Sequence, residues 1–447
     1  MLSDAVRTVF LRSDGKELLV RVGVPVKSQD AFTWLDLQSG PDRIIWGGRH
    51  RNKIRAMVGA ADVVSGRGTF AFDAGSDRIS GVLNRPGDEM KYFGGFRFDS
   101  SRPTDEVWDG FEEFRFVLPR FELHVSGDRA QVYCNLIFPE DEDYLDDILS
   151  EIERLQLADE PFDGELTMPI ARRDLPDRPT WIDRITEVVN LFSTSVLEKI
   201  VLARRVDYTF STGISALYLL KRLVRSTPNC FHFYFESNSG GKFVGATPER
   251  LFYRNGRQIE SEAVAGTRPR GESDADDEAL RTSLLTSEKD QLEHAFVRDT
   301  ILDILRAYCS SVTIDSEASE MRLARGRHLV SRISGVLQGD VADRNLIRDL
   351  HPTPAVGGHP TGDAVERIGE FEGFDRGWYA GPIGWFGRDS AEFAVALRCG
   401  VVRGNRLSLF SGAGIVVGSE PEAEWTEIEQ KIEDFVNVLG LELKLAK

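Results

Sequence analysis

In the first 150 residues, hydrophobic and polar positions alternate over short stretches. Clear examples lie at residues 18–24, 92–98 and 114–118, and glycine, proline and aspartate residues separate them. Alternation with a period of two is typical of strands that bury one face, and the separating residues favour turns. This part is therefore predicted to consist mainly of antiparallel strands.

The pattern changes after residue 140. Apolar residues at helical spacing predict a helix within 140–157, and the four prolines of residues 161–180 favour a linker. Helix and strand then mix without a regular βαβ order, with helices predicted at 181–197 and 214–224 and strands at 199–208, 231–235 and 242–253. We expect a strand-rich N-terminal part, residues 1–175, integrated in the same fold as residues 176–447.

Two later helices carry capping signals. Ser287 and Asp290 predict the start of a helix over residues 287–308. The sequence SEPE at 419–422, with a proline near the first turn, predicts the start of a last helix that ends before Gly440. Its predicted buried stripe consists of Trp425, Ile428, Ile432, Phe435 and Leu439.

Composition narrows the class of protein. A chain of 447 residues that is 41% hydrophobic can bury a large core, and it has no apolar run of about 18 residues. Its four cysteines are scattered without a CxxC pair, as in reduced cytosolic proteins, and we expect a cytoplasmic protein that binds no membrane. The formal charge of −17 argues against nucleic acid as a partner.

Two predicted helices each carry a pair of acids three residues apart, Asp290 with Glu293 and Glu424 with Glu427. This spacing places both acids of a pair on one helix face, and Lys431 follows Glu427 by four residues. Each pair taken alone is most simply a solvated helix surface. Taken together, oxygen ligands from two helices suit a hard cation such as Mg²⁺.

Two single residues are candidates for proton transfer. Lys199 opens a predicted strand, where it is either a lysine that reaches solvent at the strand end or a base in a partly desolvated pocket. Glu249 follows another strand and is either half of an exposed ion pair with Arg250 or a catalytic acid.

Six motifs in this order resemble the chorismate-utilising enzymes, over about residues 180–440. They are KIVLAR at 199–204, VGATPER at 244–250, AVAGT at 263–267, SEKDQLEH at 287–294, LHPTPAVGG at 350–358, and GAGI at 412–415 with SEPEAE at 419–424. The resemblance implies an α+β fold, with large, mostly antiparallel sheets packed face to face and helices outside. It also implies an enzyme whose substrate is chorismate.

The branch of this family depends on single residues. Branches that use water keep a lysine at the position of Lys199, and branches that use ammonia by way of a lysine nucleophile place it where this chain has Ala265. Residues 350–358 are similar to the isochorismate synthase version. The resemblance therefore implies an isomerase that moves the hydroxyl group of chorismate from C4 to C2, with no glutamine amidotransferase subunit as partner.

The resemblance also implies residue roles. Lys199 matches the general base and Glu249 the general acid. Glu293 and Glu427 match the principal magnesium ligands, and Asp290 and Glu424 match acids that reach the ion directly or through water. Positions that hold the substrate match Gly266, Thr267, His328, Tyr379, Arg398, Gly414 and Lys431.

Three alternatives stay open from the sequence. A salicylate synthase would share the acid, the base and the metal ligands, but would also eliminate pyruvate. A chorismate-binding protein with a structural cation and no turnover would not need both Lys199 and Glu249. Supply of menaquinone synthesis is favoured over siderophore synthesis by Gly357 and Gly358 and by residues 378–385 (WYAGPIGW), which resemble the menaquinone type.

Overall fold

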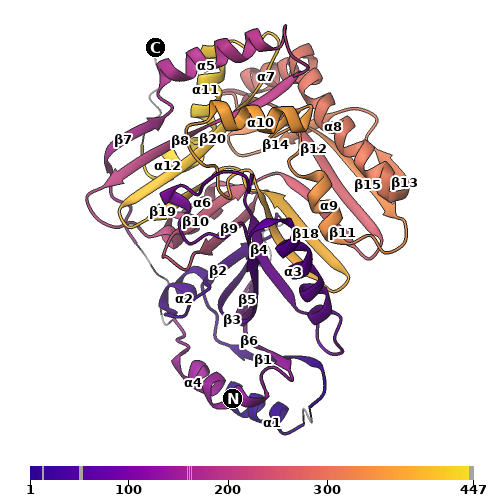
Figure 1. Ribbon diagram of the computed structural model, residues 1–447. Coiled ribbons are helices and arrows are strands. Elements are labelled where there is room, and N and C mark those ends of the chain that lie inside the picture. Colours follow the sequence, from indigo (N-terminus) through magenta and orange to yellow (C-terminus); the bar gives the residue numbers. More distant parts are fainter. Residues whose placement is uncertain (13–14, 50–53, 159, 161, 163, 442–447) are drawn as a thin grey trace.

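Two long strands, β3 (Ile54–Gly66) and β5 (Phe114–Ser126), organise the sheet. The computed structural model describes residues 1–12, 15–49, 54–158, 160, 162 and 164–441. One edge of β5 pairs with β4 (Lys91–Phe96) at residues 114–117 and with β6 (Arg129–Phe138) at residues 121–126. Because two strands divide one edge, the sheet separates here into two arms (Figure 1).

The first arm contains the strand that begins at Lys199. From β3 it continues through β2 (Ile44–Gly47), β9 (Phe231–Glu236), β10 (Lys242–Thr247), β19 (Cys399–Arg403), β20 (Arg406–Val416), β8 (Lys199–Phe210) and β7 (Pro169–Leu175). The two-residue strand β16 (Gly358–His359) pairs with the start of β8, and β1 (Leu18–Val26) extends the sheet beyond β6.

The second arm contains the strands on the other side of the division at β5. From β4 it continues through β17 (Pro382–Gly387), β18 (Ser390–Val395), β11 (Arg250–Asn255), β12 (Gln258–Pro269) and β15 (Gly326–Leu337). Strand β15 also pairs with β13 (Cys309–Ile314) and β14 (Ser319–Arg322). All these pairings are antiparallel.

Two buried clusters hold the layers together. The larger one is rich in aromatic residues and includes Trp108, Phe243 and Trp378, whose rings meet at centroid distances of 5.2 and 6.3 Å. The second contains residues of α2 (Ala31–Leu37), α6 (Ala216–Ser226) and α12 (Glu433–Val438), which cover the outer face of the first arm. Aromatic pairs of this kind add stability beyond the area that they bury.

The remaining helices lie at the ends and outside of the sheets (Figure 1). Helices α1 (Leu2–Phe10), α3 (Gly68–Leu83) and α4 (Leu145–Arg154) flank the N-terminal strands. The opposite end is covered by α5 (Arg178–Leu191), α7 (Asp274–Thr286), α8 (Glu288–Tyr308), α9 (Asp343–Leu350), α10 (Thr361–Phe371) and α11 (Pro421–Lys431). In the described part of the chain, no helix is long and apolar enough to cross a membrane.

The predicted fold class, α+β with large antiparallel sheets and outer helices, is confirmed. The predicted linker at 161–180 is partly wrong, because residues 169–175 form β7 at an edge of the sheet; residues 161 and 163 lie outside the described residues. The last helix is divided at Ile432, and Glu420, not Ser419, is its N-cap. The hydroxyl of Ser419 instead accepts a hydrogen bond from the amide of Val416.

Candidate active site

Lys199 lies at the start of β8 and is fully buried. Its Nζ is 3.0 Å from Oε1 of Glu293, which α8 presents from the other side of the cavity. Gly414 of β20 makes this contact possible, since a Cβ at this position would lie 2.3 Å from Oε1 of Glu293 and 3.1 Å from Cε of Lys199. The glycine at position 414 of the motif GAGI therefore leaves room for the contact between Lys199 and Glu293, and it does not form a flexible turn.

Glu249 lies in the connection between β10 and β11, and its side chain is 6% exposed. Its backbone is fixed on one side by Val395, whose amide donates to the carbonyl of Glu249 at 3.1 Å. Burial raises the pKa of Glu249 to about 7, although the charge of Lys199 lowers it. A carboxyl group of this kind is protonated in a large fraction of molecules near neutral pH and can donate a proton.

Lysines accompany the acids of α11. Lys431 Nζ is 2.7 Å from Oε1 of Glu427 and donates to the carbonyl of Gly412 at 2.7 Å. Lys289 of α8 contacts Oε1 of Glu424 at 2.8 Å and so joins the two helices. Burial, followed by the nearby charge of Glu427, raises the pKa of Glu424. These carboxylates are therefore close enough to repel each other.

Asp290 differs from the other three acids because an arginine engages it. Arg268 Nη2 donates to Oδ2 of Asp290 at 2.6 Å, and the side chain of Asp290 is 8% exposed. The backbone amide of Asp290 donates to the hydroxyl of Ser287, as the predicted cap requires. Asp290 does not line the cavity, so its contacts connect α8 to the end of β12.

His328 connects the residues predicted to bind substrate. Its Nδ1 is 3.0 Å from the carbonyl oxygen of Gly266 and 3.2 Å from Oγ1 of Thr267, and its Nε2 is 3.0 Å from Nη2 of Arg398. Burial, with the charge of Arg398, lowers the pKa of His328 to about 3. Because an arginine can only donate, the neutral ring accepts at Nε2 and carries its proton on Nδ1.

Arg398 is held in a rare backbone conformation. Its φ is +46°, a value that a non-glycine residue adopts at a cost of order 1–3 kcal/mol. Its Nη1 donates to Oδ2 of Asp434 at 2.9 Å. The guanidinium group is therefore oriented by Asp434 and His328 and still has free donor capacity, because it carries five N–H groups.

One cavity contains most of the predicted site residues. It is lined by Glu249, Gly266, Thr267, Glu293, His328, Tyr379, Arg398, Gly414, Glu427 and Lys431. Tyr379 stacks on Phe410 with ring centroids 5.4 Å apart, and burial raises the pKa of its hydroxyl. Lys199 joins the cavity through Glu293, whereas Asp290 and Glu424 do not line it.

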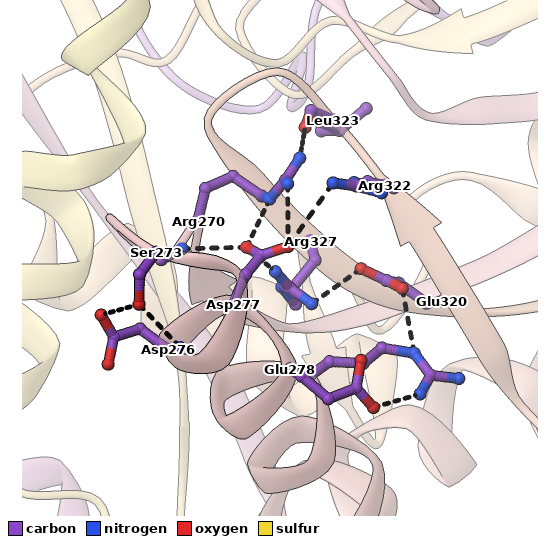
Figure 2. A network of polar contacts seen from close by, with 11 residues as sticks. Arg270, Ser273, Asp276, Asp277, Glu278, Glu320, Arg322, Leu323 and Arg327 are labelled. Carbon is purple, nitrogen blue, oxygen red and sulfur yellow. Dashed lines mark hydrogen bonds and ion pairs between the residues drawn. The ribbon is translucent and has the colours of Figure 1, made fainter.

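A charged network ties α7 to the strand ends behind Thr267 and His328 (Figure 2). Asp277 of α7 accepts from Nε and Nη2 of Arg270 at 2.7 and 2.8 Å, and also from Arg327. Arg327 is 1% exposed, and its Nη1 lies 3.0 Å from Glu320. Since Arg270 follows β12 and Arg327 lies in β15, Asp277 fixes both strands where they present cavity residues.

The donor set determines which cation these residues can hold. Glu293 and Glu427 supply hard oxygen donors to one cavity, and a divalent cation would relieve the repulsion between Glu427 and Glu424. Within the described ranges, no three histidine, cysteine, aspartate or glutamate side chains are grouped to hold an ion by themselves. The residues fit Mg²⁺, which commonly takes one or two protein carboxylates together with water and substrate oxygens.

Several contributing residues were not predicted. Ala355 and Val356, from the motif at 350–358, line the cavity, as do Val201, Leu397 and Phe410. Lys289 and Arg268 lie inside or beside quoted motifs, so their charge was a usable signal. Asp434 gave no signal in the sequence, because it lies among the apolar residues of the last helix.

Comparisons with known proteins identify the family of the chain. The chain belongs to the chorismate binding enzyme family, whose model matches residues 4–440. It is 32% identical to isochorismate synthase 2 of Arabidopsis thaliana over 366 residues, which are 80% of this chain; the match spans 65% of that relative's length. It is 34% identical to isochorismate synthase MenF of Bacillus subtilis (strain 168) over 78% of this chain and 74% of the relative.

A solved structure shares the whole architecture. The structure of MenF, the menaquinone-specific isochorismate synthase from Escherichia coli, matches with a TM-score of 0.83 at 25% sequence identity. The match covers 98% of this chain and 99% of the other. The N-terminal strands thus belong to a framework that the two proteins share over nearly their full lengths.

Proposed function

We propose that the protein is an isochorismate synthase, an isomerase that adds water to C2 of chorismate and releases the hydroxyl group of C4. One observation carries the proposal: Glu249, whose carboxyl group can hold a proton near neutral pH, and the oriented Arg398 line one cavity, and the buried Lys199 contacts Glu293 in its wall. Ala265 lines this cavity, so position 265 supplies no lysine that could attack the ring. Water is the nucleophile that these residues can activate.

Binding depends on the two carboxylates of chorismate. Arg398 grips the enolpyruvyl carboxylate with the donors that Asp434 and His328 leave free. The amides around Gly266 and Thr267 and the hydroxyl of Tyr379 line the same cavity and help to hold the substrate. This orientation brings C2 and C4 of the ring towards the proton-transfer groups.

Two proton transfers complete the reaction. Lys199 takes a proton from water as the water oxygen bonds to C2, and the double bonds of the ring shift. The bond between C4 and its oxygen breaks, and Glu249 donates its proton to the departing hydroxyl, which leaves as water. The pKa of about 7 keeps Glu249 supplied with that proton at neutral pH.

Magnesium is the cofactor that the acids fit. Glu293 and Glu427 would hold it, with Glu424 and Asp290 acting through water. When bound, the ion supplies positive charge that neutralises the ring carboxylate of chorismate and fixes the ring. Lys289 and Lys431 balance the charge of the same acids.

The pathway is the finer part of the proposal. The similarity to a menaquinone-specific enzyme over nearly the full chain favours supply of menaquinone synthesis over siderophore synthesis. A cytoplasmic location, the absence of an amidotransferase partner, and the division of the chain into residues 1–175 and 176–447 stay predictions. Salicylate synthase remains the second candidate, because it would use the same acid, base and metal ligands.

Product identity tests the proposal. Purified protein, chorismate and Mg²⁺ at neutral pH should give a mixture of chorismate and isochorismate with the same final ratio from either starting compound, measured by chromatography. Glu249→Gln protein is the matched control and should convert neither chorismate nor isochorismate. Pyruvate and salicylate formed as fast as chorismate disappears would assign the protein to the salicylate synthases instead.

A further inference from the structure

Arg49 follows β2 in the N-terminal part of the chain, and its side chain contacts the residue before Glu249. Its Nη1 and Nη2 donate to the two carboxylate oxygens of Glu262 at 2.8 Å each. Nη2 also donates to the carbonyl of Pro248, the residue before Glu249, at 2.5 Å. The side chains of Arg49 and Glu262 are only 13% and 8% exposed, so solvent screens this pair weakly.

The backbone around Glu249 is held from two directions. On one side, Val395 donates to the carbonyl of Glu249, and Thr247 Oγ1 donates to the carbonyl of Val395 at 2.6 Å. On the other side, Arg49 holds the carbonyl of Pro248. Arg49 cannot make this contact loosely, because the two-pronged bond to Glu262 fixes the plane of its guanidinium group.

Charges from every surrounding element act on Glu249. Lys199 of β8, Lys431 of α11 and Arg49 favour its ionised form, whereas Glu262 of β12 favours its protonated form. Arg250, the next residue along the chain, contacts Glu260 and Glu392 at 3.2 Å each and Glu262 at 3.9 Å. Tyr379 lies near enough to Glu249 for the two groups to interact electrostatically. Within this set, the effects of Arg49 and Glu262 oppose each other, and that of Glu262 is the larger, so Arg49 offsets part of the effect that Glu262 has on Glu249.

We propose that Arg49 and Glu262 are positioning residues for the proton donor: they fix the peptide before Glu249 and keep the buried charge behind it balanced. The inference rests on the proposed function in so far as Glu249 is the acid. It gives the N-terminal part a direct role in the chemistry, through a residue outside all six motifs.

A titration without substrate tests the balance of charge. Infrared spectroscopy follows the C=O band of protonated Glu249, which Glu249→Gln identifies by its loss. Arg49→Gln removes the two-pronged partner of Glu262, leaves this anion with Arg250 alone at 3.9 Å, and should raise the pKa of Glu249. Glu262→Gln leaves the cation of Arg49 unpaired and should lower the pKa of Glu249; each shift should be roughly 1 unit. The pKa of Glu249 in the double variant Arg49→Gln/Glu262→Gln should lie between those of the two single variants.

The matched control is Glu260→Gln, which removes a mostly exposed carboxylate that pairs with Arg250. It should leave the pKa of Glu249 unchanged. Shifts in the same direction for both single variants, or no shift in either, would overturn the inference. If a single variant does not fold, Arg49→Lys keeps the charge but loses the two-pronged bond; it should lower kcat with little change in the KM for chorismate, and an unchanged kcat would likewise overturn the inference.

This experiment separates the inference from the proposed function. The infrared titration reports on Glu249 whether or not isochorismate is formed. Opposite shifts without isochorismate formation would leave the positioning role intact and remove the assigned reaction. Isochorismate formation with an unchanged pKa of Glu249 would leave the assigned reaction intact and remove the positioning role.

Discussion

At the scale of single residues, the proposed chemistry depends on two proton-transfer groups, Lys199 and Glu249. Replacing Lys199 or Glu249 by alanine should lower kcat by roughly 10²-fold or more, the usual scale for a lost proton transfer. The rate at saturating chorismate measures the loss, and circular dichroism shows whether the fold is retained. Turnover close to that of the wild type in either variant would remove that residue from the mechanism.

Gly414 provides a residue-scale test of the ion pair. In Gly414→Ala the new Cβ would collide with Glu293 and press on Lys199, so turnover should fall by about 10²-fold, as expected for an ångström-scale displacement of a catalytic group. The matched control is Gly81→Ala in α3, where a Cβ meets no atom within 4 Å. An active Gly414→Ala enzyme would show that the pair can move without harm.

The sequence identified these residues better than it identified their contacts. Lys199, Glu249 and Gly414 could be named because each lies inside a motif. The ion pairs around the site could not be named in this way. Arg268 and Asp290 lie 22 residues apart in the sequence, and Arg398 and Asp434 lie 36 residues apart. Such pairings follow from the packing of whole elements, and no local pattern specifies them.

At the scale of elements, α11 is anchored by a buried charge cluster. Arg204 of β8, which is fully buried, contacts Glu429 of α11 and lies over the ring of Trp425 at 4.6 Å. Arg204→Met should lower the free energy of unfolding by about 3–5 kcal/mol, since it leaves a buried carboxylate with less compensation. Denaturant titration measures the loss, and the double variant Arg204→Met/Glu429→Met should recover part of it. A single variant as stable as the wild type would contradict the anchor.

From the acids of α8 and α11 we expect activity to depend on a divalent cation. Removal of the metal by EDTA should abolish turnover, and added Mg²⁺ should restore it, because Glu293 and Glu427 provide hard oxygen donors. Glu427→Gln should raise the Mg²⁺ concentration needed for half-maximal activity while the fold is retained. Full activity in excess EDTA would refute the metal requirement, and unchanged Mg²⁺ dependence in the variant would place the ion elsewhere.

The elements themselves were predicted unevenly. The starts of β1, β8, β9 and α8 agree with the periodicity and the cap at Ser287. The division of the last helix at Ile432 was missed because the apolar spacing continues across it. Strand β7 was missed because prolines suggested a linker, although an edge strand tolerates them.

At the scale of the whole molecule, the N-terminal part supplies strands that the rest of the sheet needs. Strand β17 pairs with β4, and β9 pairs with β2, so residues 176–447 alone would have both edges exposed. We therefore expect this fragment to lack a cooperative thermal transition and to aggregate, as measured by near-ultraviolet circular dichroism and light scattering. A monomeric fragment with a sharp transition would show that the part from residue 176 folds independently.

The division of β5 between two neighbours also has a consequence for synthesis on the ribosome. Strand β4 emerges from the exit tunnel long before its partner β17, since the chain between Phe96 and Pro382 must be made first. At about 5–20 residues per second, this takes roughly 15–60 s. During that time the nascent chain carries an unpaired strand edge, which is open to aggregation and to chaperone binding.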